Sequence, residues 1–184
     1  ILALFLRFKI AIWVAAGIPI AICGALIAFP PYDLTISSLT IMGFILVLGI
    51  VVDDAIVVGE RVHAFERRGF SKEDAAIEGT VEVSVPVIFG VLTTIAAFLP
   101  LLLDGTQFAA FSQLIGGTVV FCLIASLIES QLILPGHLAH RKTDGYFLEG
   151  SRLVSAWQRF QANIAEGLEY FAEHGYRRFL TVVL

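Results

Sequence analysis

The sequence has few charged residues and only two cysteines, and each shortage narrows what the chain can be. Asp, Glu, Lys and Arg make up 15% of its 184 residues, whereas a typical soluble domain carries about 25%. Apolar residues reach 58%, which largely excludes a soluble enzyme and a disordered chain. Cys23 and Cys122 lie too far apart in the sequence for a disulfide framework or a paired-cysteine metal motif. A net charge of −4 without a basic stripe gives no sign of nucleic-acid binding.

Four stretches contain no charged residue at all, and each is 19 to 24 residues long. They are Ile10–Tyr32, Leu34–Val52, Val83–Leu103 and Gly105–Ile128. Because a helix needs roughly 20 apolar residues to cross a hydrocarbon core of about 30 Å, this pattern predicts an all-α, polytopic transmembrane helix bundle. Its four full spans are expected at about 10–29, 37–60, 82–103 and 108–134. The two ends, residues 1–6 and 177–184, carry apolar runs too short to cross alone, so we interpret them as truncated spans of a longer protein.

The twelve Lys and Arg residues occupy alternate connections between these spans. They are Arg7, Lys9, Arg61, Arg67, Arg68, Lys72, Arg141, Lys142, Arg152, Arg159, Arg177 and Arg178. The intervening connections, Pro30–Ser37 and Asp104–Gln107, carry no positive charge. Cytoplasmic loops of membrane proteins are enriched in Lys and Arg. The basic connections are therefore predicted to be cytoplasmic and the other two periplasmic.

After the bundle, residues 1–141, the pattern changes to that of a cytoplasmic connector, residues 142–176. Between residues 151 and 175, apolar side chains recur at three- and four-residue steps, with charged and polar residues on the other faces. The apolar positions are Leu153, Trp157, Phe160, Ile164, Leu168 and Phe171. This spacing predicts an amphipathic helix that either lies in the membrane interface or packs against the bundle as a connector.

Two local patterns add detail to the spans. Ser71 and Asp74 have the spacing of a capping box, which predicts a helix that begins in the cytoplasm and runs into the third full span. Glycines punctuate every span, and we interpret them as sites of close helix packing rather than as hinges. They are Gly17, Gly24, Gly43, Gly49, Gly90, Gly116 and Gly117.

Asp53 and Asp54 interrupt the second full span, slightly to the cytoplasmic side of its middle. Two ionised, unpaired aspartates there cost about 5–7 kcal/mol, an amount rarely carried for structure alone. Neighbouring helical residues point about 100° apart, so both can face a polar bundle interior without stacking. Desolvation and the adjacent like charge favour the neutral acid, so the pair is expected to titrate as one unit and to relay protons. A permanently protonated or salt-bridged pair that holds helices together is the structural alternative.

Weaker relay candidates are Glu129, Thr93 and Thr94. Glu129 lies about two turns before Pro135, close enough to the cytoplasmic edge to snorkel, so we interpret it first as a boundary or packing residue. The two threonines are expected to hydrogen-bond to their own helix. No histidine has ligand spacing and no nucleophile–base pair is present, so neither a metal site nor an enzyme is expected. Every Lys and Arg lies in a loop, so a cation for the aspartates would come from outside these spans.

Three segments resemble the resistance-nodulation-division (RND) efflux permease family. Residues 40–58 (TIMGFILVLGIVVDDAIVV), followed by Glu60, are similar to the family's fourth transmembrane helix. Residues 86–100 (PVIFGVLTTIAAFLP) resemble its fifth, and residues 132–138 (LILPGHL) resemble the end of its sixth. The resemblance covers nearly the whole chain and departs at Gly59 and Arg61, where valine and asparagine are usual.

This resemblance implies a proton-driven exporter of hydrophobic or amphiphilic compounds in the inner membrane of a Gram-negative bacterium. It assigns proton translocation to Asp53 and Asp54, with a lysine partner in a second half-repeat. Protons are then the coupling ion, and no other cofactor is implied. The implied partners are periplasmic porter domains of the same permease, two further copies in a homotrimer, a periplasmic adaptor and an outer-membrane channel.

Two other functions remain open from the sequence. One is a protein-translocation accessory of the SecDF kind, which shares the architecture and an intramembrane Asp. The other is a lipid- or sterol-sensing bundle that does not pump. The consecutive aspartates and the long amphipathic segment favour the exporter, and a sensing bundle would not require two intramembrane acids.

Overall fold

The computed structural model describes residues 8–105, 107–141, 167 and 174. The chain divides into two units, and one of them, Phe8–Arg141, contains almost all of the described residues. The other unit, residues 1–7 and 142–184, contributes only Gly167 and His174. The predicted amphipathic helix and both truncated spans therefore lie outside the described residues.

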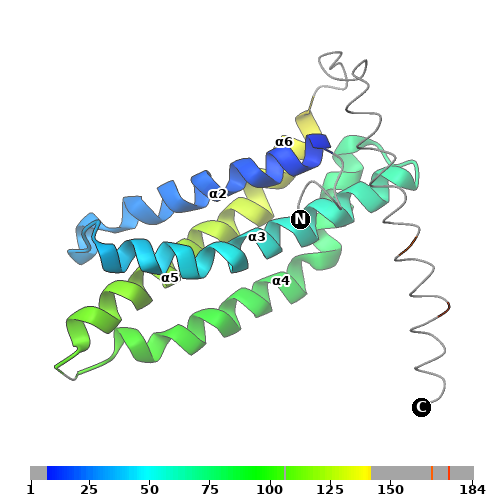
Figure 1. Ribbon diagram of the computed structural model, residues 1–184. Helices are drawn as coiled ribbons and strands as arrows, with labels where there is room; N and C mark the ends of the chain where they lie inside the picture. The colour runs from blue at the N-terminus through cyan, green and yellow to red at the C-terminus, as the bar shows by residue number, and fades with distance from the viewer. Residues whose placement is uncertain (1–7, 106, 142–166, 168–173, 175–184) are drawn as a thin grey trace. The chain divides into compact units, whose positions relative to one another are not determined.

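The unit Phe8–Arg141 is built from helices, and the described part of the chain contains no strand. Figure 1 shows its four long segments running side by side. They are α2 (Phe8–Ala28), α3 (Ser38–Arg67), α4 (Lys72–Leu102) and α5 (Ala109–Ile128), the last continued by the π-helical turn η2 (Glu129–Ile133) and by α6 (Leu134–His140). A 3-10 turn, η1 (Pro30–Tyr32), joins α2 to α3. The all-α prediction is confirmed for this unit.

Three of these segments are long and apolar enough to cross a membrane: Ser38–Arg67, Lys72–Leu102 and Ala109–His140. A fourth apolar stretch, Ile12–Ala28, is shorter. The helices extend past the predicted spans at the basic end of the bundle, where α3 continues to Arg67 and α4 already begins at Lys72. Charged residues at that end continue the helices instead of forming loops, so hydrophobicity alone underestimated their length.

Polar side chains fix the ends of α3 and α4. Ser71 accepts a hydrogen bond from the Asp74 amide at 3.1 Å, which confirms the predicted helix start, and its hydroxyl donates to the Asp74 carboxylate at 2.6 Å. At the other end of the bundle, Ser37 and Thr40 form a reciprocal capping box at the start of α3. Gly69 follows the end of α3 with a φ of 94°, a left-handed conformation that glycine adopts without strain.

Small residues let the four helices approach closely. The core cluster combines residues of α2, α3, α4 and α5: Ala21, Ala25, Val47, Val51, Val91, Val119, Cys122 and Leu123. A Cβ on Gly24 would lie 2.9 Å from the Ala125 side chain, and one on Gly116 would lie 2.9 Å from the Leu101 side chain. The packing interpretation is confirmed at such glycines. At Gly49 and Gly90 no residue of the described part of the chain lies within 4 Å of an added Cβ, so the interpretation stays a prediction there.

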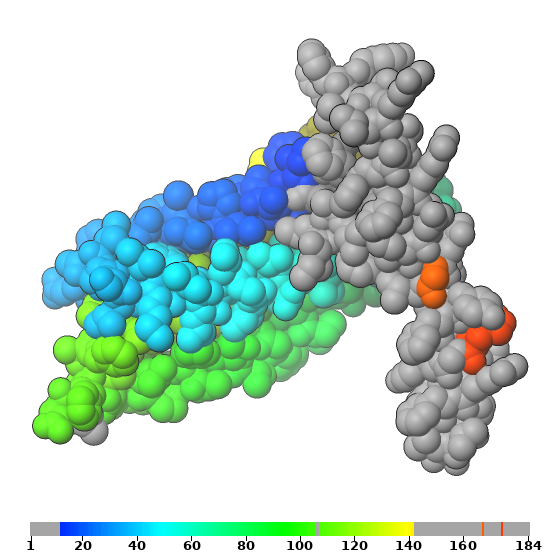
Figure 2. All heavy atoms as spheres, in the orientation of Figure 1, coloured from blue at the N-terminus to red at the C-terminus, as the bar shows by residue number. Residues whose placement is uncertain are grey.

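The outer surface of the bundle is apolar, which is the reverse of a soluble protein. The outward face of α4 exposes large apolar side chains at helical spacing, each 43–66% accessible. They are Ile77, Val81, Val85, Phe89, Leu92 and Leu99. Figure 2 shows α2, α3 and α4 as adjoining bands on one face of the molecule. Apolar surface of this extent needs a membrane or further protein to cover it, and with the three long apolar helices it makes the chain part of an integral membrane protein.

The connections alternate between the two ends of the bundle (Figure 1). The turn η1 and the α4–α5 connection lie at one end, whereas the α3–α4 turn and the end of α6 lie at the other. This alternation matches the arrangement predicted from the Lys and Arg positions. The assignment of the basic end to the cytoplasm stays a prediction.

Candidate intramembrane carboxyl site

Helix α3 places its two adjacent aspartates in different surroundings. Its buried residues follow helical spacing and include Val47, Val51, Ala55 and Val58. Asp54 stands three residues after Val51 and four before Val58, at the border of this buried face, and it is half-buried. Its Oδ2 atom is fully buried and has no hydrogen-bond partner among the residues that the structure describes. Within the described bundle, Asp54 is thus the member of the pair that turns inward.

Asp53 lies on the outer face of α3 and is exposed. Its neighbours one turn away on that face are Gly49 and Val57, and Val57 is 44% exposed. Two turns before Asp53, Ile45 is 70% exposed. The Asp53 carboxyl therefore interrupts an apolar outer stripe, a place where an ionised acid facing lipid would be costly.

No hydrogen bond or ion pair joins Asp53 or Asp54 to another residue in the described part of the chain. The basic side chains near the end of α3 interact elsewhere. Arg61 forms a two-point ion pair with Glu82 of α4, with Nε 2.7 Å from Oε2. The structure thus brings the two acids together on one helix but brings no described cation to them.

Sequence reasoning missed the ion pairs at the basic end of the bundle. Arg141 Nη2 lies 2.5 Å from both carboxylate oxygens of Glu66, and Lys72 Nζ donates to the Arg141 carbonyl at 3.0 Å. The pair of Arg61 and Glu82 had a signal in the sequence. Arg61 stands ten positions before Ser71, the residue that caps α4, and Glu82 stands eleven positions after it. Two helices joined by a turn near Ser71 therefore place these residues at similar heights. The contact of Glu66 with Arg141 joins residues 75 positions apart and had no such signal.

Glu129 does not snorkel as predicted. Its exposed fraction is 2%, and its carboxyl lies against Gly17 of α2 instead of extending to the interface. The two remaining candidates behave as expected: Thr93 donates to the Phe89 carbonyl at 2.7 Å and Thr94 to the Gly90 carbonyl at 3.0 Å. These bonds within α4 confirm the predicted back-bonding.

The histidines of the bundle take part in local contacts. His137 stacks on Trp13, with ring centroids 4.6 Å apart, and His140 Nδ1 lies 3.0 Å from the Gly136 carbonyl. Among the described residues, no group of three or more His, Cys, Asp or Glu side chains could hold a metal ion. Asp54 and Glu129 are the carboxyls that have a buried oxygen without a hydrogen bond among the described residues, and their burial calls for an explanation.

The described residues form an apolar helix bundle in which buried carboxyls have no partner among those residues, and this arrangement is that of an integral membrane protein. Comparison with known proteins identifies the family. The chain matches the AcrB/AcrD/AcrF family over residues 1–184. It is 35% identical over 121 residues to an uncharacterized transporter of Haemophilus influenzae, an alignment that covers 64% of this chain and 12% of that relative. It is 35% identical over 147 residues to the swarming motility protein SwrC of Bacillus subtilis, covering 76% and 14%. It is also 31% identical over 170 residues to the multidrug resistance protein MdtC of Pantoea ananatis, covering 92% and 16%.

The chain therefore belongs to the AcrB/AcrD/AcrF family of RND permeases, which confirms the resemblance found in the sequence. It spans 12–16% of the length of these three relatives. Their names are those of a transporter, a swarming motility protein and a multidrug resistance protein, and the first agrees with the prediction of a transport protein.

Proposed function

We propose that this chain is the first-half transmembrane segment of a proton-motive-force-driven efflux permease that exports hydrophobic or amphiphilic compounds. In this proposal Asp53 and Asp54 take up and release the coupling protons, and no other cofactor takes part. Membership of the AcrB/AcrD/AcrF family supports the exporter over a protein-translocation accessory or a sensing bundle. The multidrug resistance protein among the relatives supports the substrate class.

The observation that carries the proposal is the buried, unpartnered Oδ2 atom of Asp54. A buried carboxylate without a partner is unstable, so the group either binds a proton or meets a cation. Both states are needed in one transport cycle. The neighbouring Asp53 adds a like charge that couples the two protonation steps.

The exposed position of Asp53 supports the participation of further protein. An ionised Asp in the middle of a lipid-facing helix costs roughly 2.5–3.5 kcal/mol. Covering this stripe of α3 with another part of the permease removes that cost, and a lysine there would pair with the acids. We place the second half-repeat of the permease on this face.

The remaining features of the proposal concern the whole protein. We place it in the inner membrane of a Gram-negative bacterium, with four full spans and two truncated ones in this segment and a cytoplasmic amphipathic helix at residues 151–175. Its proposed assembly is a homotrimer that works with a periplasmic adaptor and an outer-membrane channel.

Single substitutions of the aspartates test the proposal. Asp53→Asn and Asp54→Asn each keep the size of the side chain and remove the exchangeable proton. Both variants of the full-length protein should reach the membrane at parental levels and lose export, measured as accumulation of an amphiphilic dye in intact cells. Asp33→Asn is the matched control, because Asp33 lies in the α2–α3 connection with a φ of 54°, a conformation that Asn also tolerates. Export at the parental rate by both single variants would rule out the relay.

A further inference from the structure

Glu129 is an ionisable residue of the described bundle that is almost completely buried, with 2% of its surface exposed. Its carboxyl fills the space left by the missing side chain of Gly17 on α2. A Cβ at position 17 would lie 2.6 Å from the Glu129 Cδ atom and 2.8 Å from its Oε2 atom. The carboxyl therefore rests directly against the backbone of α2.

Glu129 lies on the buried face of α5, three residues after Ser126 and seven after Cys122, and the π-helical turn η2 begins at this residue. Within η2 the Leu134 amide donates to the Glu129 carbonyl, five residues earlier, just before Pro135, which has no amide hydrogen. Residues five apart then share a face: Glu129 and Leu134 are 2% and 1% exposed, whereas Leu132 is 71% exposed. In a regular α-helix the residue three positions on would share the inner face. The wide turn thus carries the inner face from Glu129 on to Leu134.

The carboxyl has no partner within the described residues. Its Oε1 atom is buried without a hydrogen bond, and so is the Ser126 hydroxyl one turn earlier. The elements packed against η2 are α2, α3, α5 and α6. Their ionisable residues, with Arg141 after α6, are Lys9, Cys23, Asp53, Asp54, Glu60, Arg61, His63, Glu66, Arg67, Cys122, His137, His140 and Arg141.

Several of these groups are engaged with others. Arg61 pairs with Glu82, Arg141 with Glu66, and His137 stacks on Trp13. The side chain of Lys9 lies outside those that the structure describes. No described cation is paired with the Glu129 carboxyl.

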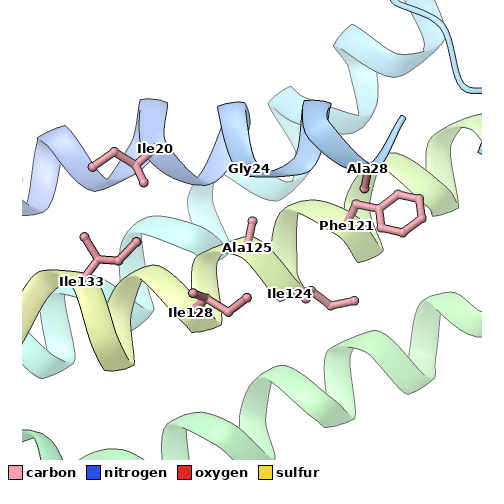
Figure 3. A pocket seen from close by; sticks show the side chains of 8 residues that line it. All are labelled: Ile20, Gly24, Ala28, Phe121, Ile124, Ala125, Ile128 and Ile133. Carbon is pink, nitrogen blue, oxygen red and sulfur yellow. The ribbon is translucent and has the colours of Figure 1, made fainter. Parts of the chain in front are cut away.

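The surroundings on the membrane side are apolar. A groove of about 190 Å³ lies between α2 and α5–η2 (Figure 3). Its lining includes Ile128, just before η2, Ile133, the last residue of η2, and Ile20, three residues after Gly17. Such a wall offers no hydrogen bond in place of water, so an ionised carboxyl beside it would lose its hydration without compensation.

We propose that the Glu129 carboxyl is a second proton-binding site of the membrane bundle, separate from Asp53 and Asp54, which holds its proton while Gly17 packs against it. Binding forms an O–H bond with a proton taken from water. Release returns the proton to water when α2 and η2 separate and the carboxyl becomes hydrated. The site thereby links proton occupancy to the contact between α2 and the α5–η2 segment, and it does not depend on the relay proposed for α3.

Infrared spectroscopy of the full-length protein in lipid vesicles tests this site. The parent for the measurement is the Asp53→Asn/Asp54→Asn double variant, which removes the other two acids from the middle of the described spans. At neutral pH it should show the carbonyl absorption of a protonated carboxyl, and adding Glu129→Gln should remove that band. An unchanged spectrum overturns the proposal. Because transport by the α3 variants is read separately, failure of the relay and failure of this site are distinguishable.

A matched pair of glycine variants tests the contact itself. Gly17→Ala places a methyl group against the carboxyl, whereas Gly24→Ala on the same helix places one 2.9 Å from the Ala125 Cβ atom. Displaced toward water, the acid in Gly17→Ala should lose its proton at a pH lower by about one unit or more, and Gly24→Ala should titrate like the parent. Equal titration of the two variants would show that Gly17 does not hold the proton in place.

A chemical readout covers the case in which Glu129→Gln or Gly17→Ala fails to fold. Dicyclohexylcarbodiimide is apolar, dissolves in the membrane and adds to protonated carboxyl groups. Mass spectrometry of the protein without substitutions should find the adduct on Glu129 after treatment at neutral pH. The absence of that adduct, with Asp53 or Asp54 modified in the same sample, counts against the site.

Discussion

Arg141 holds both carboxylate oxygens of Glu66 at 2.5 Å from its Nη2 atom, and this contact joins the end of α6 to the end of α3. The two side chains are only 15% and 14% exposed. Lys72, at the start of α4, donates to the Arg141 carbonyl. Three helices therefore meet in one polar cluster at the basic end of the bundle, and α3, which carries Asp53 and Asp54, is fixed there relative to its neighbours.

Removing Arg141 should destabilise the bundle measurably. In Arg141→Gln the Glu66 carboxylate loses a two-point, partly buried ion pair, and hydrogen bonds to charged groups contribute about 1.5–3 kcal/mol each. We expect a loss of unfolding free energy of that order in denaturant titrations of the detergent-solubilised protein. Arg61→Gln breaks the more exposed pair with Glu82, whose side chains are 30% and 45% accessible, and should have little effect. An equal loss in both variants would contradict the distinction.

The glycines of α4 should respond in opposite ways to alanine. A Cβ on Gly79 would lie 2.8 Å from the Val62 Cα and N atoms of α3, and this backbone cannot yield as a flexible side chain does. Gly79→Ala should therefore cost about 1–3 kcal/mol of unfolding free energy. Gly90 faces open space, so Gly90→Ala should be neutral or stabilising because alanine favours the helix. Thermal unfolding followed by tryptophan fluorescence compares the two, and a stable Gly79→Ala variant would show that α3 and α4 are not so closely packed.

The sidedness of the bundle can be measured with single cysteines. The protein used for labelling carries Cys23→Ala and Cys122→Ala. Alanine is a suitable replacement for Cys122 because this small side chain lies in the core, with 1% of its surface exposed. Arg68→Cys lies in the α3–α4 turn and Asp33→Cys in the α2–α3 connection, at opposite ends of the bundle (Figure 1). A membrane-impermeant maleimide should label position 33 in intact cells and position 68 only in inverted vesicles, as the positive-inside rule requires. The reverse pattern would overturn the topology.

The sequence was sufficient to predict an all-helical chain with long apolar helices, because that signal is local. A run of about 20 residues without charge can hardly be anything but a membrane helix, and a carboxyl inside such a run is conspicuous wherever the helix packs. The capping residue Ser71 was found for the same reason. An error of length arose at the basic end of α3, which continues as helix to Arg67 through charged residues such as Glu66.

The environment of each acid could not be predicted, because it depends on which helix lies opposite. The carboxyl of Glu129 fits against Gly17, which is 112 positions earlier in the sequence, and a π-helical turn that begins at Glu129 shifts the inner face of the residues that follow. Likewise, Asp53 and Asp54 are adjacent in sequence, but only the packing of α3 against its neighbours sends one outward and the other inward. These are tertiary contacts, and a periodic pattern on one helix does not record them.

The outer stripe of α3 leads to a prediction about the complete permease. Ile45 and Val57 are 70% and 44% exposed on the same face as Asp53. If the second half-repeat covers this face, as the cost of a lipid-facing carboxylate requires, a nitroxide spin label at position 57 should collide often with membrane-dissolved oxygen in the isolated segment. In the full-length protein the same label should be shielded. A second label at position 81 of α4, near the basic end, is the control for how much oxygen reaches each sample. The ratio of the oxygen accessibility at position 57 to that at position 81 is compared between the segment and the full-length protein. A ratio that does not change between segment and full-length protein would show that the Asp53 face stays against lipid, and the placement of a cationic partner on that face would then be wrong.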